Sequence, residues 1–489
     1  MSVNMHLLGI DLGTSSIKAV LMNDQQLVLG SSSQALEVLR PQLGWSEQVP
    51  ANWLTAVDQV MQALQRAHPQ AMADVQGIAL SGHMHGATLI DAQNEVLRPC
   101  ILWNDTRSYQ EAAELDANPL FRNLSGNIVF PGFTAPKLVW VQKHEPLLFD
   151  KVHKVLLPKD YVRWWLTGEY ASDMSDAAGT AWLDVAKRAW SKELLAASGM
   201  RLEQMPKAIE GTEISGYLHS KLAERWGIKQ RVVVAGGAGD NAAAACGMGV
   251  VAAGSAFVSL GTSGVLFAAT ASYLPNPASA VHTFCHAIPN TWHQMGVILS
   301  ATDSLNWYAQ ITNQTPAELT QALGERLKAP SKVCFLPYLS GERTPHNDAL
   351  IRGAFIGLSH ADRPVDLTQA VLEGVAFAIR DNLNALKAAG TSLERVTAVG
   401  GGSRSHYWLK VLATTLNLPI DLPAEGDFGA AFGAARLALI AATQANPLEV
   451  LTAPPVAQTI EPEAEYIQAF SEAYQHYQQL YPALKGASL

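Results

Sequence analysis

The chain has 489 residues, of which 48% are hydrophobic and 16% charged, and its formal net charge is −9. This length exceeds what one ordinary hydrophobic core can serve, so we expect a globular protein of two or three domains. The negative charge and the absence of any basic run argue against a nucleic-acid partner.

The N-terminal segment and the cysteines bear on the compartment. The start, "MSVNMHLLGIDLG", has no basic region and reaches Asp11 too early for a signal peptide. No window holds the ~18 uncharged apolar residues that a membrane span needs. The four cysteines show neither metal-ligand spacing nor the pattern of a disulfide scaffold: Cys100, Cys246, Cys285 and Cys334. These features predict a cytoplasmic enzyme without a membrane partner.

The first half of the chain alternates strand and helix patterns. Two apolar runs flank the turn "DLGTSS", and a second turn, "NDQQ", precedes "LVLG", which predicts a β-meander. A helical spacing of apolar residues follows in "NWLTAVDQVMQALQRA", and "VQGIALSG" returns to a strand. "ILWND" resembles a further strand, and "TRSYQEAAEL" resembles the start of a helix. This alternation is typical of an α/β domain.

The second half repeats this theme. The tetrapeptide Leu-Gly-Thr-Ser occurs at residues 12–15 and again at 260–263, each time between two apolar runs. Four common residues can match by chance, but the matched setting favours an internal duplication. "RVTAVGGGSRS" followed by "HYWLKVLATTLN" predicts a strand, a glycine loop and a helix. We place the domain boundary in the small-residue segment 247–254.

The two glycine turns are candidates for phosphate binding. Glycine lets the backbone approach a ligand closely, and the neighbouring hydroxyls can donate hydrogen bonds to phosphate oxygens. Either turn alone is better explained as a plain hairpin. One turn in each half, with Asp11 beside the first, favours a polyphosphate held from both sides. A carboxylate near phosphates is explained by a Mg²⁺ ion between them, bound directly or through water.

The loop chemistry differs from that of the common nucleotide motifs. No G-x-x-x-x-G-K-[ST] segment is present, and "GGGSRS" does not match G-x-G-x-x-G. "GGGSRS" can instead present bare backbone to a flat ring such as adenine, or it can be a generic strand-to-helix turn.

Asp240 is the one charged residue of "VVVAGGAGDNAAAACGMG", between a predicted buried strand and a predicted helix. An aspartate there can simply cap the helix, a role worth ~1 kcal/mol. Three nearby glycines argue for more, because they clear the approach to the carboxylate: Gly236, Gly237 and Gly239. We expect the helix dipole to keep the carboxylate ionised. Because positioning dominates phosphoryl transfer, Asp240 is a plausible base for an alcohol that attacks a phosphate. The pattern predicts a kinase acting on a small alcohol.

A series of motifs in chain order resembles the FGGY family of carbohydrate kinases, within the actin-like ATPase superfamily. They run from about residue 8 to 439 and are jointly specific: "GIDLGTSSIK", "SGHMHG", "LWNDTR", "PGFTAPKL", "AGGAGDNAAAACG", "SLGTSG", "PYLSGERTPHND", "LEGVAFAIRDN" and "GGGSRS". The resemblance implies an α/β fold with two actin-like (ribonuclease H-like) domains and a catalytic cleft between them. We expect a sugar-binding domain over 1–247 with the first phosphate loop, a nucleotide-binding domain over 255–445, and a helical tail over 446–489.

The resemblance also implies a role for each matching residue. Asp240 is the implied catalytic base, and Asp11 the implied catalytic residue and metal ligand that positions Mg²⁺-ATP. The implied nucleotide contacts are Gly13, Thr14, Ser15 and Lys18 at the first loop, Gly261 and Thr262 at the second, and Gly401 and Gly402 near adenine. The implied sugar contacts are Met84, His85, Trp103, Asn104, Phe133, Asp240 and Asn241. ATP, Mg²⁺, a small sugar and a homodimer are implied as well.

The substrate expectation rests on one motif. "SGHMHG" is similar to the "SGQMHG" of family members that phosphorylate D-xylulose, and it lacks the Arg-Glu pair of those that phosphorylate glycerol. We therefore expect phosphorylation of a ketopentose, with D-xylulose first. Position 83 is His where that pattern has Gln, so another pentulose or a pentitol is an alternative. A nucleotide-switched binding protein is the alternative from a different class.

Several polar residues have plainer explanations. His83 and His85 lack a clear third ligand for a metal, so we expect hydrogen-bonding roles. We expect Glu342 and Arg343 to brace the wall of the cleft, and Glu373 to pair with Arg380 or a backbone amide. We expect the helix "GAAFGAARLALIAA" to pack closely against a neighbour.

Overall fold

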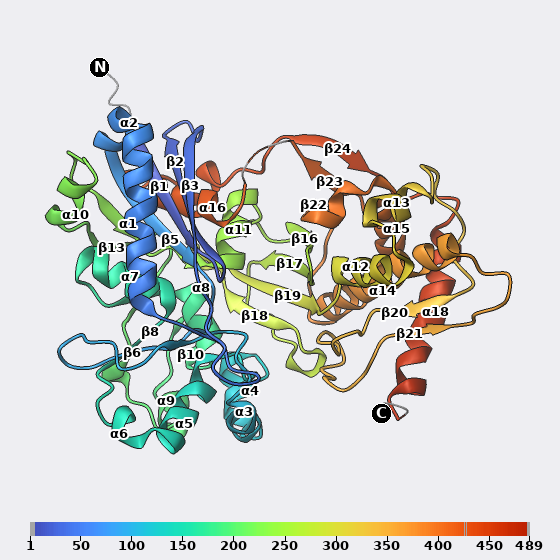
Figure 1. Cartoon of the computed structure of the whole chain (residues 1–489), viewed down its shortest axis with the longest axis horizontal. Helices are drawn as coiled ribbons and strands as arrows, with labels where there is room; N and C mark the ends of the chain where they lie inside the picture. The colour runs from blue at the N-terminus through green and yellow to red at the C-terminus, as the bar shows by residue number, and fades with distance from the viewer. Residues whose placement is uncertain (1–4, 425, 427, 487–489) are drawn as a thin grey trace.

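Two lobes, each built on a mixed β-sheet, form the computed structural model, which describes residues 5–424, 426 and 428–486. Figure 1 shows the first lobe on the left in blue to green, and the second on the right in yellow to red. The predicted α/β class is confirmed. Among the described residues, no helix combines the length and hydrophobicity that spanning a bilayer requires.

The first sheet begins with the predicted meander. β1 (His6–Leu12), β2 (Ser16–Asn23) and β3 (Val28–Ala35) are antiparallel neighbours, and β5 (Val75–Gly82) runs parallel to β1. β14 (Val233–Ala235) pairs with β5 and β13 (Ile214–Tyr217) with β14, while the short β15 (Ala238–Gly239) continues beside β5. β1 is an almost continuous apolar run because both faces of the sheet are covered.

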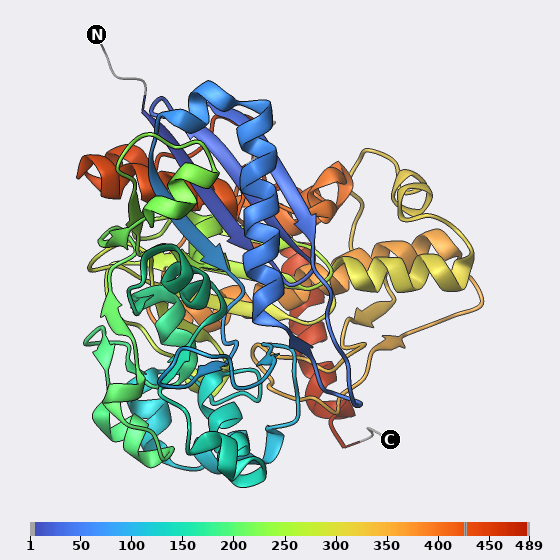
Figure 2. The same cartoon turned by 60° about the vertical axis from the view of Figure 1, so that its left-hand side comes forward.

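Two pairs of helices cover the two faces of this sheet. α1 (Pro50–Ala67) and α7 (Pro158–Thr167) pack in one apolar cluster with β1 and β5. α11 (Asp240–Met248) and α16 (Ala430–Thr443) lie on the opposite face. Figures 1 and 2 both show the red-orange α16 beside the blue strands, although its sequence lies near the C-terminus.

The second sheet repeats the topology of the first. Its strands are, in sheet order, β18 (His282–Cys285), β19 (Trp292–Ile298), β17 (Gly264–Thr270), β16 (Ala256–Leu260), β22 (Val396–Val399), β23 (Ile420–Pro423) and β24 (Val456–Ile460). β16 pairs antiparallel with β17 and parallel with β22, as β1 does with β2 and β5. The repeated tetrapeptide therefore marks the first hairpin of two equivalent sheets, as predicted.

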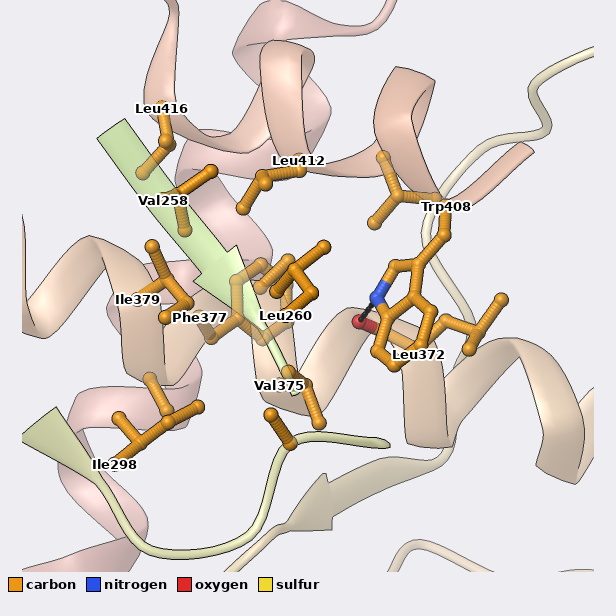
Figure 3. Packing of buried hydrophobic residues seen from close by; sticks show 14 of the residues in the cluster. Val258, Leu260, Ile298, Leu372, Val375, Phe377, Ile379, Trp408, Leu412 and Leu416 are labelled. Carbon is orange, nitrogen blue, oxygen red and sulfur yellow. Dashed lines mark hydrogen bonds between the residues drawn. The ribbon is translucent and has the colours of Figure 1, made fainter. Parts of the chain in front are cut away.

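The core of the second lobe lies between β16 and two helices, α14 (Pro364–Ala388) and α15 (His406–Leu416). Figure 3 shows Val258 and Leu260 of β16 pointing toward side chains of both helices. The buried Trp408 indole donates a hydrogen bond to the carbonyl of Leu372 (3.0 Å), which ties α15 to α14.

Shorter elements complete both lobes. In the first lobe they are β4 (Glu47–Gln48), α2 (Pro69–Ala73), β6 (Thr88–Ile90), β7 (Cys100–Ile101), α3 (Tyr109–Asp116), α4 (Pro119–Ser125), α5 (Thr134–His144), α6 (Pro146–Phe149), β8 (Lys154–Leu156), β9 (Ala171–Asp173), α8 (Met174–Ala177), β10 (Leu183–Asp184), β11 (Ala189–Trp190), α9 (Lys192–Ala197), β12 (Lys207–Ile209) and α10 (Ser220–Arg225). In the second they are α12 (Thr302–Thr312), α13 (Pro316–Gln321), β20 (Cys334–Leu336), β21 (Ala354–Ile356) and α18 (Ile467–Leu484), whereas α17 (Pro447–Val450) packs with α16 against the first sheet.

Three segments differ from the sequence expectation. The strand expected over 101–105 stops at Ile101, so Trp103 and Asn104 lie on a turn, and the helix after it begins only at Tyr109. The segment 446–489, expected to be a helical tail, also supplies the edge strand β24, and α18 buries aromatic side chains in the second core. α16 falls within the range expected for the second domain but packs on the first sheet.

Candidate active site

The first glycine turn joins β1 to β2. The Gly13 amide donates to the carbonyl of Ser16 (3.0 Å), which closes the hairpin that the sequence predicts. Thr14 is held from two sides, because the Trp103 indole donates to its hydroxyl (3.0 Å) and the Gln48 amide donates to its carbonyl (2.8 Å). Ser15 at the tip is exposed to solvent.

Strand register brings Asp11 and Asp240 to the same edge of the sheet. Asp11 lies opposite Lys18 on β2 and next to Ser81 on β5. Gly239, at the end of β15, pairs with Gly82 of β5, and Gly82 pairs in turn with Leu12. The carboxyl ends of β1, β5 and β15 therefore meet, with one aspartate just before the end of β1 and one just after β15.

Asp240 is the first residue of α11, and Gly239 takes the N-cap position that we considered for it. Its Oδ1 accepts from the Asn241 amide (2.8 Å) and the Asn241 side chain (3.1 Å). Burial and then the nearby Asp11 carboxylate raise its pKa to about 6. The expected effect of the helix dipole is thus outweighed, and the carboxyl group gains basicity instead.

The predicted sugar contacts gather beside Asp240. The His85 ring stacks on Phe133, with ring centroids 4.7 Å apart, and a Cβ on Gly239 would lie 2.9 Å from the Cγ of Met84. A Cβ on Gly132 would lie 2.4 Å from the Trp103 carbonyl, so the turn of Trp103 also borders this group. The Asn104 Oδ1 atom is buried and has no hydrogen-bond partner among the described residues, as expected of a group that awaits a ligand.

His85 is fixed as a neutral acceptor. Its Nδ1 lies 2.6 Å from the carbonyl of Gly179, and because a carbonyl only accepts, Nδ1 carries the proton and Nε2 presents a lone pair. Burial, together with the charge of Lys137, lowers its pKa to about 3. His85 has φ 71, a conformation that Thr134 and Lys137 stabilise by donating to its carbonyl (3.1 and 2.8 Å).

His83, the departure from the family pattern, is buried next to α1. Its ring packs edge-on against Trp53, with centroids 6.0 Å apart, and burial lowers its pKa to about 3. Neither ring nitrogen has a hydrogen-bond partner among the described residues. Its neighbour Trp53 donates to Gln48 (3.1 Å), the same side chain that holds the carbonyl of Thr14.

The second glycine turn is bonded to Thr302, which lines a large pocket. Thr302, at the start of α12, donates through its amide (2.9 Å) and hydroxyl (2.7 Å) to the carbonyl of Gly261, and the Ala301 amide donates to that of Thr262 (2.8 Å). A pocket of about 760 Å³ opens beside this turn. It is lined by Thr302, Leu305, Asn306, Pro316, Ala317, Thr320, Gln321, Gly324, Glu325, Gly401, Gly402, Arg404, Ser405, His406, Tyr407 and Trp408.

The glycine loop 400–402 is shaped by its neighbours. A Cβ on Gly402 would lie 2.8 Å from the Cβ of Leu260, whereas a Cβ on Gly401 would meet nothing within 4 Å. Gly401 thus leaves bare backbone toward the pocket, next to the second glycine turn. A pocket of this size can hold a purine ring.

Residues of the second lobe also border the sugar side, which sequence reasoning did not assign. Arg343 lies over the Phe130 ring (4.0 Å to the centroid), and Phe130 contacts Phe133 (5.7 Å). Glu342 accepts from the amides of Leu299 and Arg343, in line with the expected bracing role, and burial raises its pKa to about 8. The "GERT" motif was visible in the sequence, but its approach to Phe130 depends on how the lobes pack.

The donor set suits a divalent cation. Two carboxylates lie at one sheet edge, where Asp11 contributes to the raised pKa of Asp240, and carboxylate oxygen is the ligand that Mg²⁺ prefers.

The chain is similar to known proteins over nearly its whole length. The model for the FGGY family of carbohydrate kinases matches with its N-terminal domain at residues 6–247 and its C-terminal domain at 256–442. The chain is 49% identical to the xylulose kinase of Escherichia coli strain K12, over 98% of this chain and 99% of that protein. It is also 49% identical to the xylulose kinase of Klebsiella pneumoniae, over 89% of each.

Solved structures resemble the whole chain. A xyloylose kinase from Brucella ovis superposes with a TM-score of 0.98 at 63% identity, covering 99% of this chain and 100% of that one. The xylulose kinase from Rhodospirillum rubrum superposes with a TM-score of 0.92 at 28% identity, covering 98% and 99%. The chain therefore belongs to the FGGY family of carbohydrate kinases.

Proposed function

We propose that the protein transfers the γ-phosphoryl group of ATP to the terminal hydroxyl of D-xylulose and forms D-xylulose 5-phosphate. The observation that carries the proposal is Asp240, a carboxyl group with a pKa of about 6 that directly follows Gly239, the glycine beside Met84. The nearly full-length similarity to xylulose kinases supports the choice of sugar.

Asp240 accepts the proton of the attacking hydroxyl in the proposed reaction. The sugar oxygen forms a bond to the γ-phosphorus while the bond to the β–γ bridging oxygen breaks and ADP leaves. A base with a pKa near 6 is mostly ionised at neutral pH and still accepts a proton readily. His85, through Nε2, and Asn104, through Oδ1, accept hydrogen bonds from hydroxyl groups of the sugar and fix its orientation.

The nucleotide is proposed to bridge the lobes. The turns at Gly13–Ser15 and Gly261–Thr262 hold the phosphates with Lys18, and the pocket beside Gly401 and Gly402 takes the adenine. Asp11 would hold Mg²⁺, directly or through water, and the ion would neutralise charge on the phosphates. We thus assign sugar binding to residues 1–247 and nucleotide binding to 255–445.

A cytoplasmic location is proposed from the sequence features described above, and a homodimer from the family resemblance alone. Size-exclusion chromatography with light scattering tests the dimer. A mass equal to one 52.5 kDa chain at micromolar concentration would contradict it.

The test of the function is ADP release from Mg²⁺-ATP with D-xylulose, D-ribulose, L-ribulose, D-arabinitol, xylitol and glycerol. We expect the highest kcat/KM for D-xylulose. A different preferred polyol would keep the kinase and change its substrate, with His83 as the first position to vary. If no sugar stimulates ADP release, a nucleotide-switched binding protein becomes the better explanation.

A further inference from the structure

A fully buried cluster of charges lies behind Asp240 and takes no part in the reaction described above. It combines three aspartates with two cations, all with fully buried side chains: Lys159, Asp160, Arg163, Asp173 and Asp176. They come from α7, β9 and α8, of which α8 contacts β15. Buried charges are costly unless they are paired, so a specific role is a reasonable expectation.

Lys159 is the centre of this cluster. Its ammonium nitrogen lies 2.7 Å from Asp160 Oδ1, 2.6 Å from Asp173 Oδ1 and 2.8 Å from Asp176 Oδ2. The three carboxylates are close enough together to bind a metal ion, but the ammonium group already supplies their cation. Burial raises the pKa of Asp176 well above its usual range, and Lys159 acts in the opposite direction.

A short chain of hydrogen bonds leads from this cluster to the candidate base. Asp173 Oδ2 accepts from the Ser175 hydroxyl, and the Ser175 oxygen accepts from the Gly239 amide (3.0 Å). A serine hydroxyl has a single proton, so donation to the carboxylate leaves only lone pairs for the amide. The amide nitrogen of Gly239, the residue directly before Asp240, is therefore held by a hydroxyl whose position Asp173 and Lys159 determine.

The other end of the same glycine segment is also held by the cluster. Arg163 donates to Asp160 (2.6 Å) and to the carbonyl of Gly236. Three of the four residues from 236 to 239 are glycines, and Gly237 has φ 71. Glycine has the largest conformational freedom of all residues, so such a segment positions a side chain accurately only if other groups fix its backbone.

We propose that Ser175, oriented by Asp173 and Lys159, is a positioning residue for phosphoryl transfer. Its oxygen fixes the Gly239 amide and thereby places the Asp240 carboxylate at the attacking hydroxyl. The inference rests on the proposed role of Asp240 as the base. A displacement of about 1 Å at such a group can lower turnover ~100-fold.

The experiment compares Ser175→Ala with Ser198→Ala in the full-length protein. Ser198 is equally buried, accepts from the Trp182 indole (2.8 Å) and donates to a backbone carbonyl of α9. Both variants should lower Tm by similar amounts, since each loses a buried hydroxyl. Only Ser175→Ala should lower kcat, by roughly 10- to 100-fold, with the KM for ATP changed less than about twofold. Ser175→Thr keeps the hydroxyl, so its kcat should be close to that of the wild type.

Rates are measured with whichever sugar of the panel the wild-type protein phosphorylates fastest. A wild-type protein without activity toward D-xylulose contradicts the proposed function, and the ratio between variants still tests Ser175 on the preferred sugar. A kcat for Ser175→Ala equal to that of Ser198→Ala overturns the inference. If circular dichroism shows that Ser175→Ala is unfolded, Ser175→Cys replaces it, because sulfur is only a weak acceptor, and an unchanged kcat then overturns the inference.

Discussion

At the scale of single residues, the raised pKa of Asp240 depends on the positions at which β1 and β15 end. β1 and β15 both run beside β5, and their ends bring a second carboxylate, Asp11, near the first. Burial and this neighbour raise the pKa of Asp240, although it stands at the N-terminus of a helix. A desolvated carboxylate next to another outweighs a dipole effect of about 0.3–1 kcal/mol.

Asp240→Asn should remove the base and leave nucleotide binding intact. The amide has the same size and cannot accept the hydroxyl proton, so we expect kcat to fall by about 10³-fold. Titration calorimetry with Mg²⁺-ATP should give a dissociation constant close to that of the wild type. Equal losses of turnover and ATP affinity would argue against the assignment of Asp240 as the base.

Two glycines allow the two substrate sites to be perturbed separately. In Gly239→Ala the new methyl group meets the Met84 side chain, which is flexible enough to move toward the sugar. We expect a higher KM for the sugar and an unchanged KM for ATP. In Gly401→Ala the methyl group enters the open space of the pocket, so we expect a higher KM for ATP and an unchanged KM for the sugar. Steady-state kinetics with each substrate varied in turn measures both KM values for each variant. If the two variants change the same KM value, the assignment of two separate sites is contradicted.

At the scale of elements, α14 shows how a helix accommodates a buried carboxyl group. Both Glu373 oxygens accept from the Ser331 amide (3.0 and 3.2 Å), and Oε1 also accepts from the Gln369 side chain (2.7 Å). The expectation of a backbone amide partner is confirmed, and Arg380 pairs elsewhere. Burial raises the pKa of Glu373 to about 8, so the folded protein retains a proton that the unfolded chain releases.

Glu373→Gln should therefore stabilise the protein in a pH-dependent manner. Because the folded-state pKa is the higher one, the wild-type chain loses stability as pH rises from about 4.5 to about 8. The variant lacks this loss, so its Tm should equal that of the wild type near pH 4.5 and exceed it by roughly 5 °C at pH 8. Scanning calorimetry at pH 5, 7 and 8 measures this, with the exposed Glu394→Gln as control. A difference in Tm that does not grow with pH would show that Glu373 is ionised in the folded protein.

At the scale of the whole molecule, the β18–β19 hairpin of the second lobe is bonded to the first. The Arg188 guanidinium donates to the carbonyls of Thr291, His286 and Ile288 and pairs with Glu210 (2.6 Å). Asn127 exchanges two further hydrogen bonds with Thr283 (2.9 Å each). A closing motion around the substrates must therefore carry this hairpin with the first lobe or bend the second sheet beside it.

Arg188→Met should weaken the coupling between the lobes. Methionine fills part of the volume, but the carbonyl oxygens and Glu210 lose their donor, which costs about 3–5 kcal/mol for a buried charge partner. We expect a lower Tm and a calorimetric transition that splits in two. Arg231→Met, which removes an exposed cation lying over Tyr217 (3.8 Å), is the control and should keep one transition. A single, unshifted transition in Arg188→Met would contradict the coupling.

Local signals made much of this molecule predictable from its sequence. Glycine turns between apolar runs, at residues 12–15 and 260–263, predict two equivalent hairpins because turn chemistry and strand alternation are short-range properties. The position of Asp240 between a strand and a helix follows in the same way.

Long-range packing could not be read in the same manner. Ser175 precedes Gly239 by 64 positions, and only the fold of α7, β9 and α8 brings its hydroxyl to that amide. The sequence predicts a strand over 101–105 because apolar residues continue past Ile101, whereas β7 ends at Ile101. The residues that follow form a turn, which Asp105 fixes by accepting from the Ser46 amide. The raised pKa of Asp240 likewise depends on burial and on Asp11, which strand pairing determines.

Because α16 packs on the first sheet, the first lobe cannot complete its core until the ribosome has made a segment near the C-terminus. Residues up to 247 emerge first, yet the face of β1 and β5 that carries Leu7 and Ala79 is covered only by α11 until α16, which starts at Ala430, has been made. At roughly 5–20 residues per second, synthesis of the intervening segment takes about 10–40 s. During that interval a nascent first lobe exposes apolar surface to the translating cell, so chaperone capture of stalled chains should be strongest when translation is arrested before α16 and should fall once α16 has emerged.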